Sequence, residues 1–519
     1  MRVNAIVGVP PELQAYSLAK YSRSNQSLTE SIFELSAQRA EKFLETYYFA
    51  YGHRSIADLA HITITVEQIS MLAAFYLSDE PLWDGQSRSS RYQNFRENGY
   101  HVPSQLNETP AHEQYTRAIE FLFERYEFFA RELGDVLRGV LPKPEAMSDS
   151  AYIRAVQARA FDVARYMLPL ATLTSSGQVT SGRVLERQIS RLRAHGLSEL
   201  REIGDALAKA CRVRATDYTE GKLRQVWQNL GMNESEIDRY LTALTDERVL
   251  HQPAAPTLVR YTAPDQFPRQ ALSAVEEYLG SRLRINGGLL DDTTVSLIEP
   301  ETDLLDALVH SMLYLVDPNG RSYAQLSSLV ATLTPEEKRE VVTRAMRARG
   351  EHDEWLRVQR VGYVVGFDVF GDFGALRDLH RHRRCIQLIP DLKLDLGFPA
   401  LASIFQQGLG EDGAHLATER GLIEAFELAL GQAIETAQAF PQTDCALYLL
   451  PLAARQRMAF KMDLAEAASL IELRSRVGGH FSYRGIAYTM YQLLCQRYPF
   501  LTDAIRATNP QEVVDLLNR

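Results

Sequence analysis

Apolar residues recur along most of this chain at the three-and-four spacing of amphipathic helices. Residues 28–52 carry this spacing and end at a glycine, which predicts a helix with a glycine stop. Two segments break the pattern. In residues 61–67 (HITITVE) and 361–370 (VGYVVGFDVF), every second residue belongs to one apolar face, and both segments are rich in β-branched or aromatic types. Both are predicted to be half-buried β-strands.

The features that follow the two predicted strands occur in the same order in both halves of the chain. An apolar, helical segment follows each strand. Further on, ARYMLPLA (164–171) in one half corresponds to ALYLLPLA (446–453) in the other, and each is followed by a helical pattern ending in arginines. We therefore predict two tandem units, residues 1–235 and 250–519, joined where prolines interrupt the pattern.

Composition narrows the class of protein. The chain has 519 residues, a net charge of −10 and 24% charged residues. This balance argues against a nucleic-acid-binding protein, because such binding rests on neutralising phosphates. The cysteines form no CxxC pair and indicate neither a disulfide framework nor a zinc site; they are Cys211, Cys385, Cys445 and Cys495. The sequence shows no signal peptide and no apolar run that could span a bilayer, so a cytoplasmic protein without membrane contact is expected.

A dense basic run stands out against this acidic background. Residues 378–387 (DLHRHRRCIQ) place arginines and histidines together between apolar segments. If the run is helical, Arg377, Arg381 and Arg384 lie on one face, where they repel each other unless an anion offsets their charge. Arginine suits phosphate, since its planar fork donates two hydrogen bonds. A solvated charged surface is the alternative interpretation.

Other motifs carry weaker signals. Residues 85–95 (GQSRSSRYQNF) combine hydroxyls and arginines in a turn-like stretch, which suits either a phosphate cradle or an exposed loop. GLGEDG (408–413) matches GxGxxG, but it follows a helical pattern and carries two carboxylates, so a dinucleotide loop is rejected. No nucleophile motif appears, and His380 and His382 lack the partners of a metal site.

Together the motifs resemble flavin-dependent thymidylate synthase, the ThyX family. Its usual order is GH-x-S/T, a strand and helix, RHR, seven residues, SxRY and ARxxLP. The resemblance implies an α/β (α+β) fold, with a small, mostly antiparallel sheet packed with long helices in each unit. It also implies FAD as cofactor, dUMP as substrate, and methylenetetrahydrofolate and NADPH as co-substrates. Family members are homotetramers with active sites between subunits.

The first half keeps one part of the family's motif set. It has GHRS at 52–55, SSRY at 89–92 and ARYMLP, but SDE stands where RHR belongs. By resemblance, the flavin side would use His53, Ser55 and Asp58. The nucleotide side would use Ser89, Ser90, Arg91 and Arg165.

The second half keeps the complementary part. It has RHR at 381–383, but Asp391 stands where the family has serine, and Leu447 replaces the motif arginine. By resemblance, Arg381, His382, Arg383 and Asp463 would contact the cofactor, and Asp378 would lie near the substrate. Arg474 and Arg381 would be the catalytic residues, with Arg474 against the uracil.

Because the losses are complementary, we infer that the two halves build one composite site and that the other site is degenerate. The fused chain is then expected to form a homodimer that mimics the family's homotetramer. The alternative is a protein that binds flavin or nucleotide in this fold without turnover.

Overall fold

The computed structural model describes most of the chain. The described residues are 8–21, 54–91, 94–285, 291–298, 303–348, 356, 365–502, 505–511 and 516–517. The predicted helix at 28–52 and the motif residue His53 therefore lie outside them. Two compact units are present. Unit 1 comprises residues 1–66, 82–86 and 176–265, and unit 2 comprises residues 67–81, 87–175 and 266–519. These units are defined by contacts and differ from the predicted repeats, whose boundaries stay a prediction.

A four-stranded antiparallel sheet forms the centre of unit 2. Its strand order is β4 (Val295–Ile298), β5 (Val365–Asp372), β7 (Arg455–Met462) and β6 (Ile386–Leu388). The register places Phe367 of β5 opposite Phe460 of β7. All eight residues of β5 are buried, so the expected half-buried strand at 361–370 is wrong in that respect. The strand lies between two others and is covered on both faces, and its described part begins at Val365.

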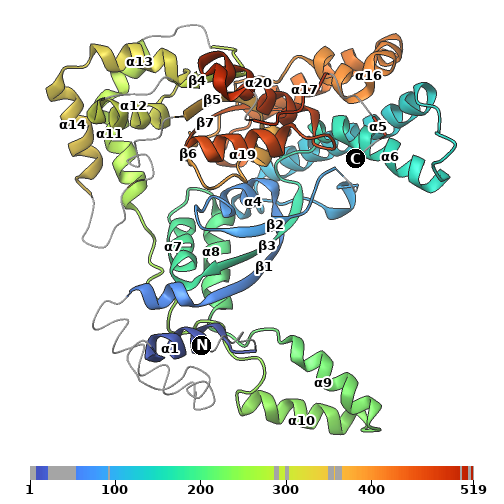
Figure 1. The fold of residues 1–519 in the computed structure, drawn as a ribbon, viewed down its shortest axis with the longest axis vertical. Coiled ribbons are helices and arrows are strands. Elements are labelled where there is room, and N and C mark those ends of the chain that lie inside the picture. The colour runs from blue at the N-terminus through green and yellow to red at the C-terminus, as the bar shows by residue number, and fades with distance from the viewer. Residues whose placement is uncertain are drawn as a thin grey trace. The chain divides into compact units, whose positions relative to one another are not determined.

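Long helices surround this sheet (Figure 1). The longest is α5 (Pro110–Val140), which packs against α6 (Asp149–Ala164) and the helices after β6. The other helices near the sheet are α15 (Phe373–Leu379), α16 (Leu401–Glu419), α17 (Leu422–Gln438), α19 (Leu464–Ser475) and α20 (Phe481–Arg497). Short helical turns connect them, and these are α4 (Met71–Leu77), η3 (Arg96–Asn98), η4 (Ser104–Leu106), η5 (Arg165–Met167), α18 (Thr443–Ala446), η7 (Leu447–Leu449) and η8 (Pro499–Leu501).

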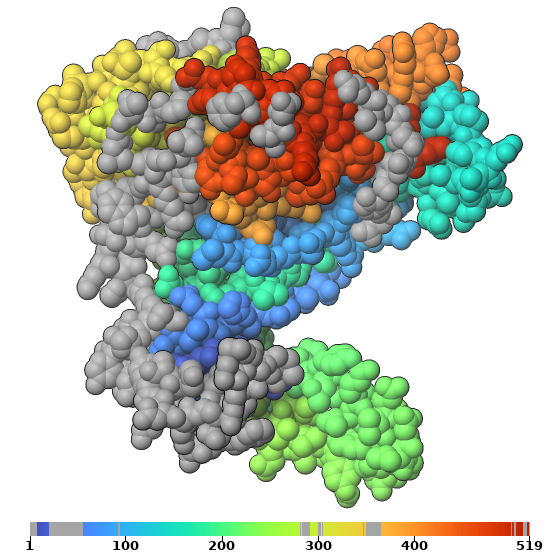
Figure 2. Space-filling view, in the orientation of Figure 1, coloured from blue at the N-terminus to red at the C-terminus, as the bar shows by residue number. Residues whose placement is uncertain are grey.

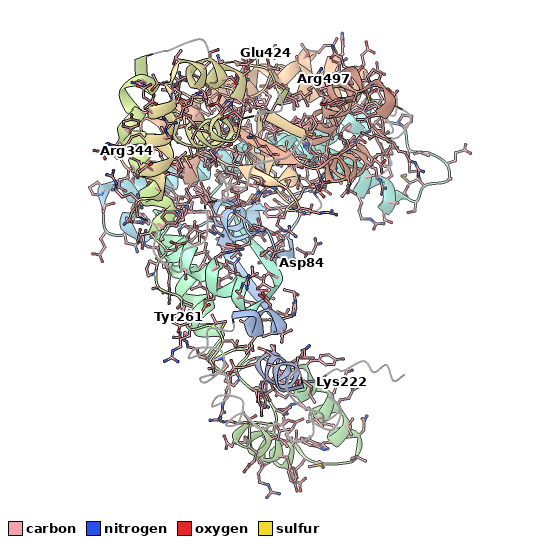
Figure 3. The ribbon with its side chains drawn as sticks, turned by 60° about the vertical axis from the view of Figure 1, so that its left-hand side comes forward. Asp84, Lys222, Tyr261, Arg344, Glu424 and Arg497 are labelled. Carbon is pink, nitrogen blue, oxygen red and sulfur yellow. The ribbon has the colours of Figure 1, made fainter. Side chains whose placement is uncertain are left out.

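Four further helices of unit 2 pack against the sheet and share a core with residues of β4, β6 and β7. They are α11 (Phe267–Ile285), α12 (Leu304–Val316), α13 (Tyr323–Thr332) and α14 (Pro335–Met346). Their buried side chains share one hydrophobic core with Ile386, Leu388 and Ala459. Arg344 on the outer part of α14, labelled in Figure 3, lies with its guanidinium 4.6 Å from the ring of Tyr278 on α11. Capping boxes begin α13 and α14, which explains why these helices start where they do.

The second sheet has the order β1 (His61–Ser70), β3 (Leu173–Ser181) and β2 (Asp84–Ser87), and the chain passes between the units within β1 and β3. The predicted strand at 61–67 is confirmed. Unit 1 also contains α1 (Pro11–Tyr21), η2 (Arg54–Leu59), α7 (Gly182–Arg193), α8 (Ser198–Ala210), α9 (Tyr218–Asn229) and α10 (Glu234–Asp246). The last two form a small hairpin with its own apolar cluster (green in Figure 2).

The two halves of the chain repeat the same local structures. In each half a strand leads directly into a short helix, β1 into α4 and β5 into α15. Ser70 and Asp372 occupy the same place and cap these helices through their side-chain oxygens. Likewise, Ser181 caps α7 and Asp463 caps α19. The predicted helices at 183–193 and 464–476 are therefore confirmed, and each begins with a side-chain cap.

The segments ARYMLPLA (164–171) and ALYLLPLA (446–453), which we call the LP motifs, meet each other within unit 2. The Leu170 amide donates to the Leu450 carbonyl at 2.8 Å, and the Leu452 amide donates to the Leu168 carbonyl at 2.9 Å. Because Leu168 corresponds to Leu450 and Leu170 to Leu452 in the two motifs, each contact is the reciprocal of the other. Such reciprocity is the property of a two-fold symmetric interface. Here it occurs inside one chain.

Candidate functional site

Five arginines and one aspartate gather in unit 2, and we call them the arginine cluster. Arg91 lies in the turn after β2, and Arg165 begins η5. Arg377 and Asp378 lie on the last turn of α15, and Arg381 follows that helix. The fifth arginine is Arg474, on the last turn of α19. Side chains from both halves of the sequence therefore contribute to one cluster.

The basic run itself is not the helix face that its spacing predicted. Helix α15 ends at Leu379, and His380 is its C-cap. The arginines that follow therefore leave in different directions. Arg381 Nη2 lies 3.7 Å from Asp378, whereas the Arg384 side chain is 76% exposed and lies 3.9 Å from Asp463. The expectation that Arg377, Arg381 and Arg384 share a face is thus wrong, because the helix stops before the run.

Ser90 joins the two halves at the cluster. Its hydroxyl oxygen accepts from Arg165 Nη1 at 3.4 Å and from Arg377 Nη2 at 3.1 Å. The serine is 1% exposed. A hydroxyl that bridges two guanidinium groups marks a place where an anion would have donors on two sides.

Arg165 has unused donors in this buried place. Its side chain is 1% exposed, and Nε and Nη2 have no hydrogen-bond partner among the described residues. Asp378 lies 3.8 Å from Nη1. The helix α15 approaches closely, since a Cβ on Gly374 would lie 3.4 Å from Arg165 Nη2. Buried donors without acceptors are costly, so an anionic ligand here would be stabilised.

Asp378 holds a negative charge among the guanidinium groups. Burial opposes its ionisation, but Arg381, Arg165, Arg377 and Arg474 outweigh that effect and lower the pKa of Asp378 to about 2. Arg377 shows the opposite balance. Removal from solvent, with Arg165 and Arg381 nearby, lowers the pKa of Arg377 to about 10, although Asp378 counteracts this. One carboxylate therefore compensates only part of the cluster's positive charge.

A chain of three side chains positions Arg474. The Arg474 Nε donates to His382 Nε2 at 2.8 Å, and His382 Nδ1 lies 3.4 Å from Glu466 Oε1. Burial lowers the pKa of His382, which favours the neutral imidazole, although Glu466 opposes this. With Nε2 accepting from Arg474, the remaining proton belongs on Nδ1, facing Glu466. His382 thus orients Arg474, a contact between two motifs that lie apart in the sequence.

Arg91 is engaged with a residue that the sequence motifs did not single out. Its Nε donates to Asp162 Oδ1 at 2.7 Å and its Nη2 donates to Asp162 Oδ2 at 3.2 Å. Its Nη1 donates to the Gly478 carbonyl at 3.1 Å. The planar fork is therefore directed at Asp162. Ser89, two residues before Arg91, accepts from the Arg91 amide at 3.4 Å.

The other predicted site residues within the described part of the chain are Arg383, Asp463, Asp58 and Ser55. Arg383 Nη1 donates to the Arg381 carbonyl at 3.1 Å. Asp463 caps α19 by accepting from the Glu466 amide at 2.9 Å. Asp58 belongs to unit 1, where it lies 3.2 Å from Arg183. Ser55 lies in η2, and its side chain is outside the described part of the structure.

Sequence reasoning missed Asp162, Glu466 and His480. The Asp162 side chain is fully buried, and its backbone carbonyl oxygen lies 2.9 Å from His480 Nε2, within hydrogen-bonding distance. Its position three residues before Arg165, in the last turn of α6, was the available signal. Glu466 was detectable as the third residue of α19 after its cap. His480 had no signal in the sequence, since its place depends on the packing of α20.

Three general properties complete the description. In the part of the chain that the structure describes, no group of histidine, cysteine and acidic side chains could hold a metal ion. All four cysteines are free. Each helix among the described residues is too short or too polar to cross a lipid bilayer.

Comparisons with known proteins place the chain. The family model "Thymidylate synthase complementing protein" (Thy1) matches residues 9–215 and 398–500, one segment in each predicted repeat. The RHR residues 381–383 lie between these segments. A UPF0159 protein of Chlamydia pneumoniae is 23% identical over 93% of this chain and 87% of its own length. A UPF0159 protein of Chlamydia muridarum is 28% identical over 90% and 80%, respectively.

Solved structures give local similarities. The flavin-dependent thymidylate synthase ThyX from Helicobacter pylori, complexed with FAD and dUMP, is 18% identical. It covers 39% of this chain and 89% of its own, with a TM-score of 0.23. The UMP/dUMP methylase PolB from Streptomyces cacaoi, bound with 5-Br dUMP, is 17% identical over 38% and 84%, with a TM-score of 0.27. Since the family model matches more than half of the residues, the chain belongs to the thymidylate synthase complementing protein family.

Proposed function

We propose that this protein methylates dUMP to dTMP reductively, with FAD as cofactor and with methylenetetrahydrofolate and NADPH as co-substrates. Membership of the family supports the reaction class. The observation that carries the proposal is the arginine cluster. Ser90 and Arg165 from the first half and Arg377 and Arg381 from the second surround one place that has unused buried donors.

The residues fit a nucleotide phosphate. Arg165 offers Nε and Nη2, and Arg377 offers Nε, all buried and without partners among the described residues. A phosphate brings three acceptor oxygens and up to two negative charges, and it would satisfy donors from both arginines. The Ser90 hydroxyl, released from the guanidinium groups, would then donate to the phosphate as well.

Arg474 would act on the uracil. Its charge near a carbonyl oxygen of the base would favour the enolate form, which develops when carbon or hydride is added. The pKa of Arg474 is lowered, mainly by burial, and a buried cation interacts more strongly with developing charge than one in water. His382 is the positioning residue that fixes its direction.

Bound FAD would supply the redox chemistry, and Arg381, His382, Arg383 and Asp463 are the described residues that would hold it. Ser55, Asp58 and His53 are proposed, from the family resemblance of the first half, as cofactor-binding residues. The protein is further proposed to be a cytoplasmic homodimer.

A binding protein without turnover is the second candidate. The Asp378 carboxylate supports it, because an ionised group among the arginines already offsets part of their charge. The bidentate contact of Arg91 with Asp162 also supports it, since that arginine has less to offer a substrate.

The first test is spectroscopic. The purified full chain is mixed with FAD, its visible spectrum is recorded, and dUMP is then added. The proposed enzyme takes up flavin, shows a spectral change with dUMP and forms dTMP with both co-substrates. Flavin uptake and a dUMP response without dTMP would favour the binding protein. Absence of both would reject the proposal.

Variants then locate the site. Arg165→Ala and Arg474→Ala, in different halves, are each expected to reduce turnover by about 10²–10³-fold, the usual cost of losing one charge-stabilising donor. Arg420→Ala, at an exposed position after α16, is the matched control and should leave turnover unchanged. Full activity in either cluster variant would contradict the composite site.

A further inference from the structure

A large cavity lies within unit 2, and no residue of the arginine cluster lines it. Its volume is about 1100 Å³, at the upper end of the range for small-molecule sites. The walls come from α16, α20, the end of β5 and the beginning of β7, with a contribution from α6.

Arg484 on α20 is the cavity's least satisfied charge. The side chain is 8% exposed, and its Nε donates to the Ser475 carbonyl at 3.1 Å. Its Nη2 has no hydrogen-bond partner among the described residues. Burial lowers the pKa of Arg484, as expected for a cation without a carboxylate. An uncompensated buried charge is unfavourable unless an anion comes close.

The other charges on the walls have partners or are exposed to solvent. Arg455 pairs with Asp292 and also donates from Nε to the Leu396 carbonyl at 3.1 Å. Asp372 accepts from the Ala375 amide at 2.8 Å and from the Ser482 hydroxyl. Arg159 lies 3.6 Å from Asp162, and Glu411 is exposed to solvent. These pairs leave Arg484 as the group that would attract a ligand.

Aromatic rings and neutral polar groups complete the lining. Phe370, Tyr488 and Phe481 contribute rings, and Gln492 and Thr489 contribute an amide and a hydroxyl. A ligand that uses both kinds of wall needs an anionic group and a flat apolar part. We propose that this cavity is a second binding site, for an aromatic organic anion, in which Arg484 contacts the acidic group.

Gly485 gives a direct way to fill the cavity. It lines the cavity on α20, and a Cβ built there meets no atom within 4 Å. A side chain added at this position therefore begins in open space beside the residues that line the cavity. Gly431 on α17 is the matched control, because a Cβ there also meets no atom within 4 Å and the residue does not line the cavity.

The probe is 8-anilinonaphthalene-1-sulfonate, titrated into the full chain and followed by fluorescence. The proposal expects saturable binding that persists with saturating dUMP. Arg484→Met and Gly485→Phe should each weaken it at least tenfold, whereas Gly431→Phe should bind as the parent does. Thermal melts show whether each variant folds. If Arg484→Met does not fold, the Gly485→Phe variant decides the outcome alone.

Three results would overturn the proposal. They are absence of saturable binding, full displacement by dUMP, and equal affinity in a folded Gly485→Phe variant. Sedimentation velocity adds a fourth. If Gly485→Phe changes the oligomeric state and leaves the probe's affinity unchanged, the cavity belongs to an interface between copies. None of these results depends on whether the protein makes dTMP.

Discussion

At the scale of single residues, the arginine cluster carries more positive charge than its carboxylate can offset. Four guanidinium groups, those of Arg165, Arg377, Arg381 and Arg474, act on one carboxylate, Asp378, while Arg91 pairs with Asp162. Arg165 keeps buried donors without acceptors among the described residues. A site that is complete without its ligand would gain little from binding it. Here a phosphate would replace contacts that are long, such as the 3.8 Å separation between Arg165 and Asp378.

Asp378 is expected to limit nucleotide affinity. Its negative charge repels a phosphate, and at an effective dielectric of ~20 a unit charge roughly 8 Å away costs about 2 kcal/mol. Asp378→Asn should therefore bind dUMP about tenfold or more tightly, measured by isothermal titration calorimetry. Asp391→Asn, at an exposed position after β6, should leave the affinity unchanged. Weaker binding by Asp378→Asn would show that the carboxylate orders the arginines instead.

Asp378 also predicts how stability depends on pH. Its pKa is about 2 in the folded protein, below the usual 3.8, so its ionised form favours the folded state. This contribution is fully present above pH 4 and is lost as the pH falls towards 2. Its size is about 2 kcal/mol. Chemical unfolding of the parent and of Asp378→Asn from pH 5 to 2 checks it, because the parent should lose that much more stability than the variant.

The sequence motifs identified the members of the cluster but not their contacts. Ser90, Arg165 and Arg381 could be named because the family's motifs carry them. The pairing of Arg91 with Asp162 could not, since Asp162 becomes a partner only when α6 places it beside the turn after β2. The link from Glu466 through His382 to Arg474 likewise depends on α15 and α19 meeting.

At the scale of elements, helix ends decide where the charged residues lie. α15 stops at Leu379, so the basic run leaves the helix, and α19 starts at a capping Asp463 and carries Arg474 at its far end. Periodicity predicted α19 well, because its apolar positions repeat at helical spacing. It predicted the end of α15 poorly. Basic residues are common in the last turn of a helix, but a continuous run of them, with no glycine directly after Leu379, does not mark where the helix stops.

Substitutions of Asp463 separate two effects: the stability that its helix cap provides and the affinity that the proposed cofactor contact provides. Asp463→Ala should destabilise the protein by about 1 kcal/mol, the usual cost of losing a capping oxygen. Asp463→Ser should keep most of that stability, because Ser181 caps α7 in the same way in the first half. Thermal denaturation gives both values. If the serine variant matches the parent in stability but changes the affinity for FAD, Asp463 contacts the cofactor as proposed.

At the scale of the whole molecule, the recurrence of a strand followed by a short helix, β1 into α4 and β5 into α15, was visible in the sequence because the periodicities recur in the same order. The four helices α11 to α14 were not anticipated as a separate layer. Their positions depend on a core shared with β6 and β7, and a shared core leaves no local signature. Side chains from two distant halves of the sequence therefore lie in one cluster, and the halves meet both through Ser90, which contacts Arg165 and Arg377, and through the reciprocal contact of the LP motifs.

Separating the halves tests this arrangement. Residues 1–265, which keep α10 intact, supply Ser90 and Arg165, and residues 266–519 supply Arg377, Asp378 and Arg474. The bonds between Leu170 and Leu450 and between Leu452 and Leu168 cross from one segment to the other, so each segment alone exposes a surface that the other normally covers. Co-expressed segments should associate and bind dUMP with an affinity within about tenfold of the full chain, since a linker adds effective concentration but no contact. Either segment alone should bind at least 10²-fold more weakly. Calorimetry on the co-purified pair and on each soluble segment measures this, and parent-like binding by one segment would mean that the site is not shared.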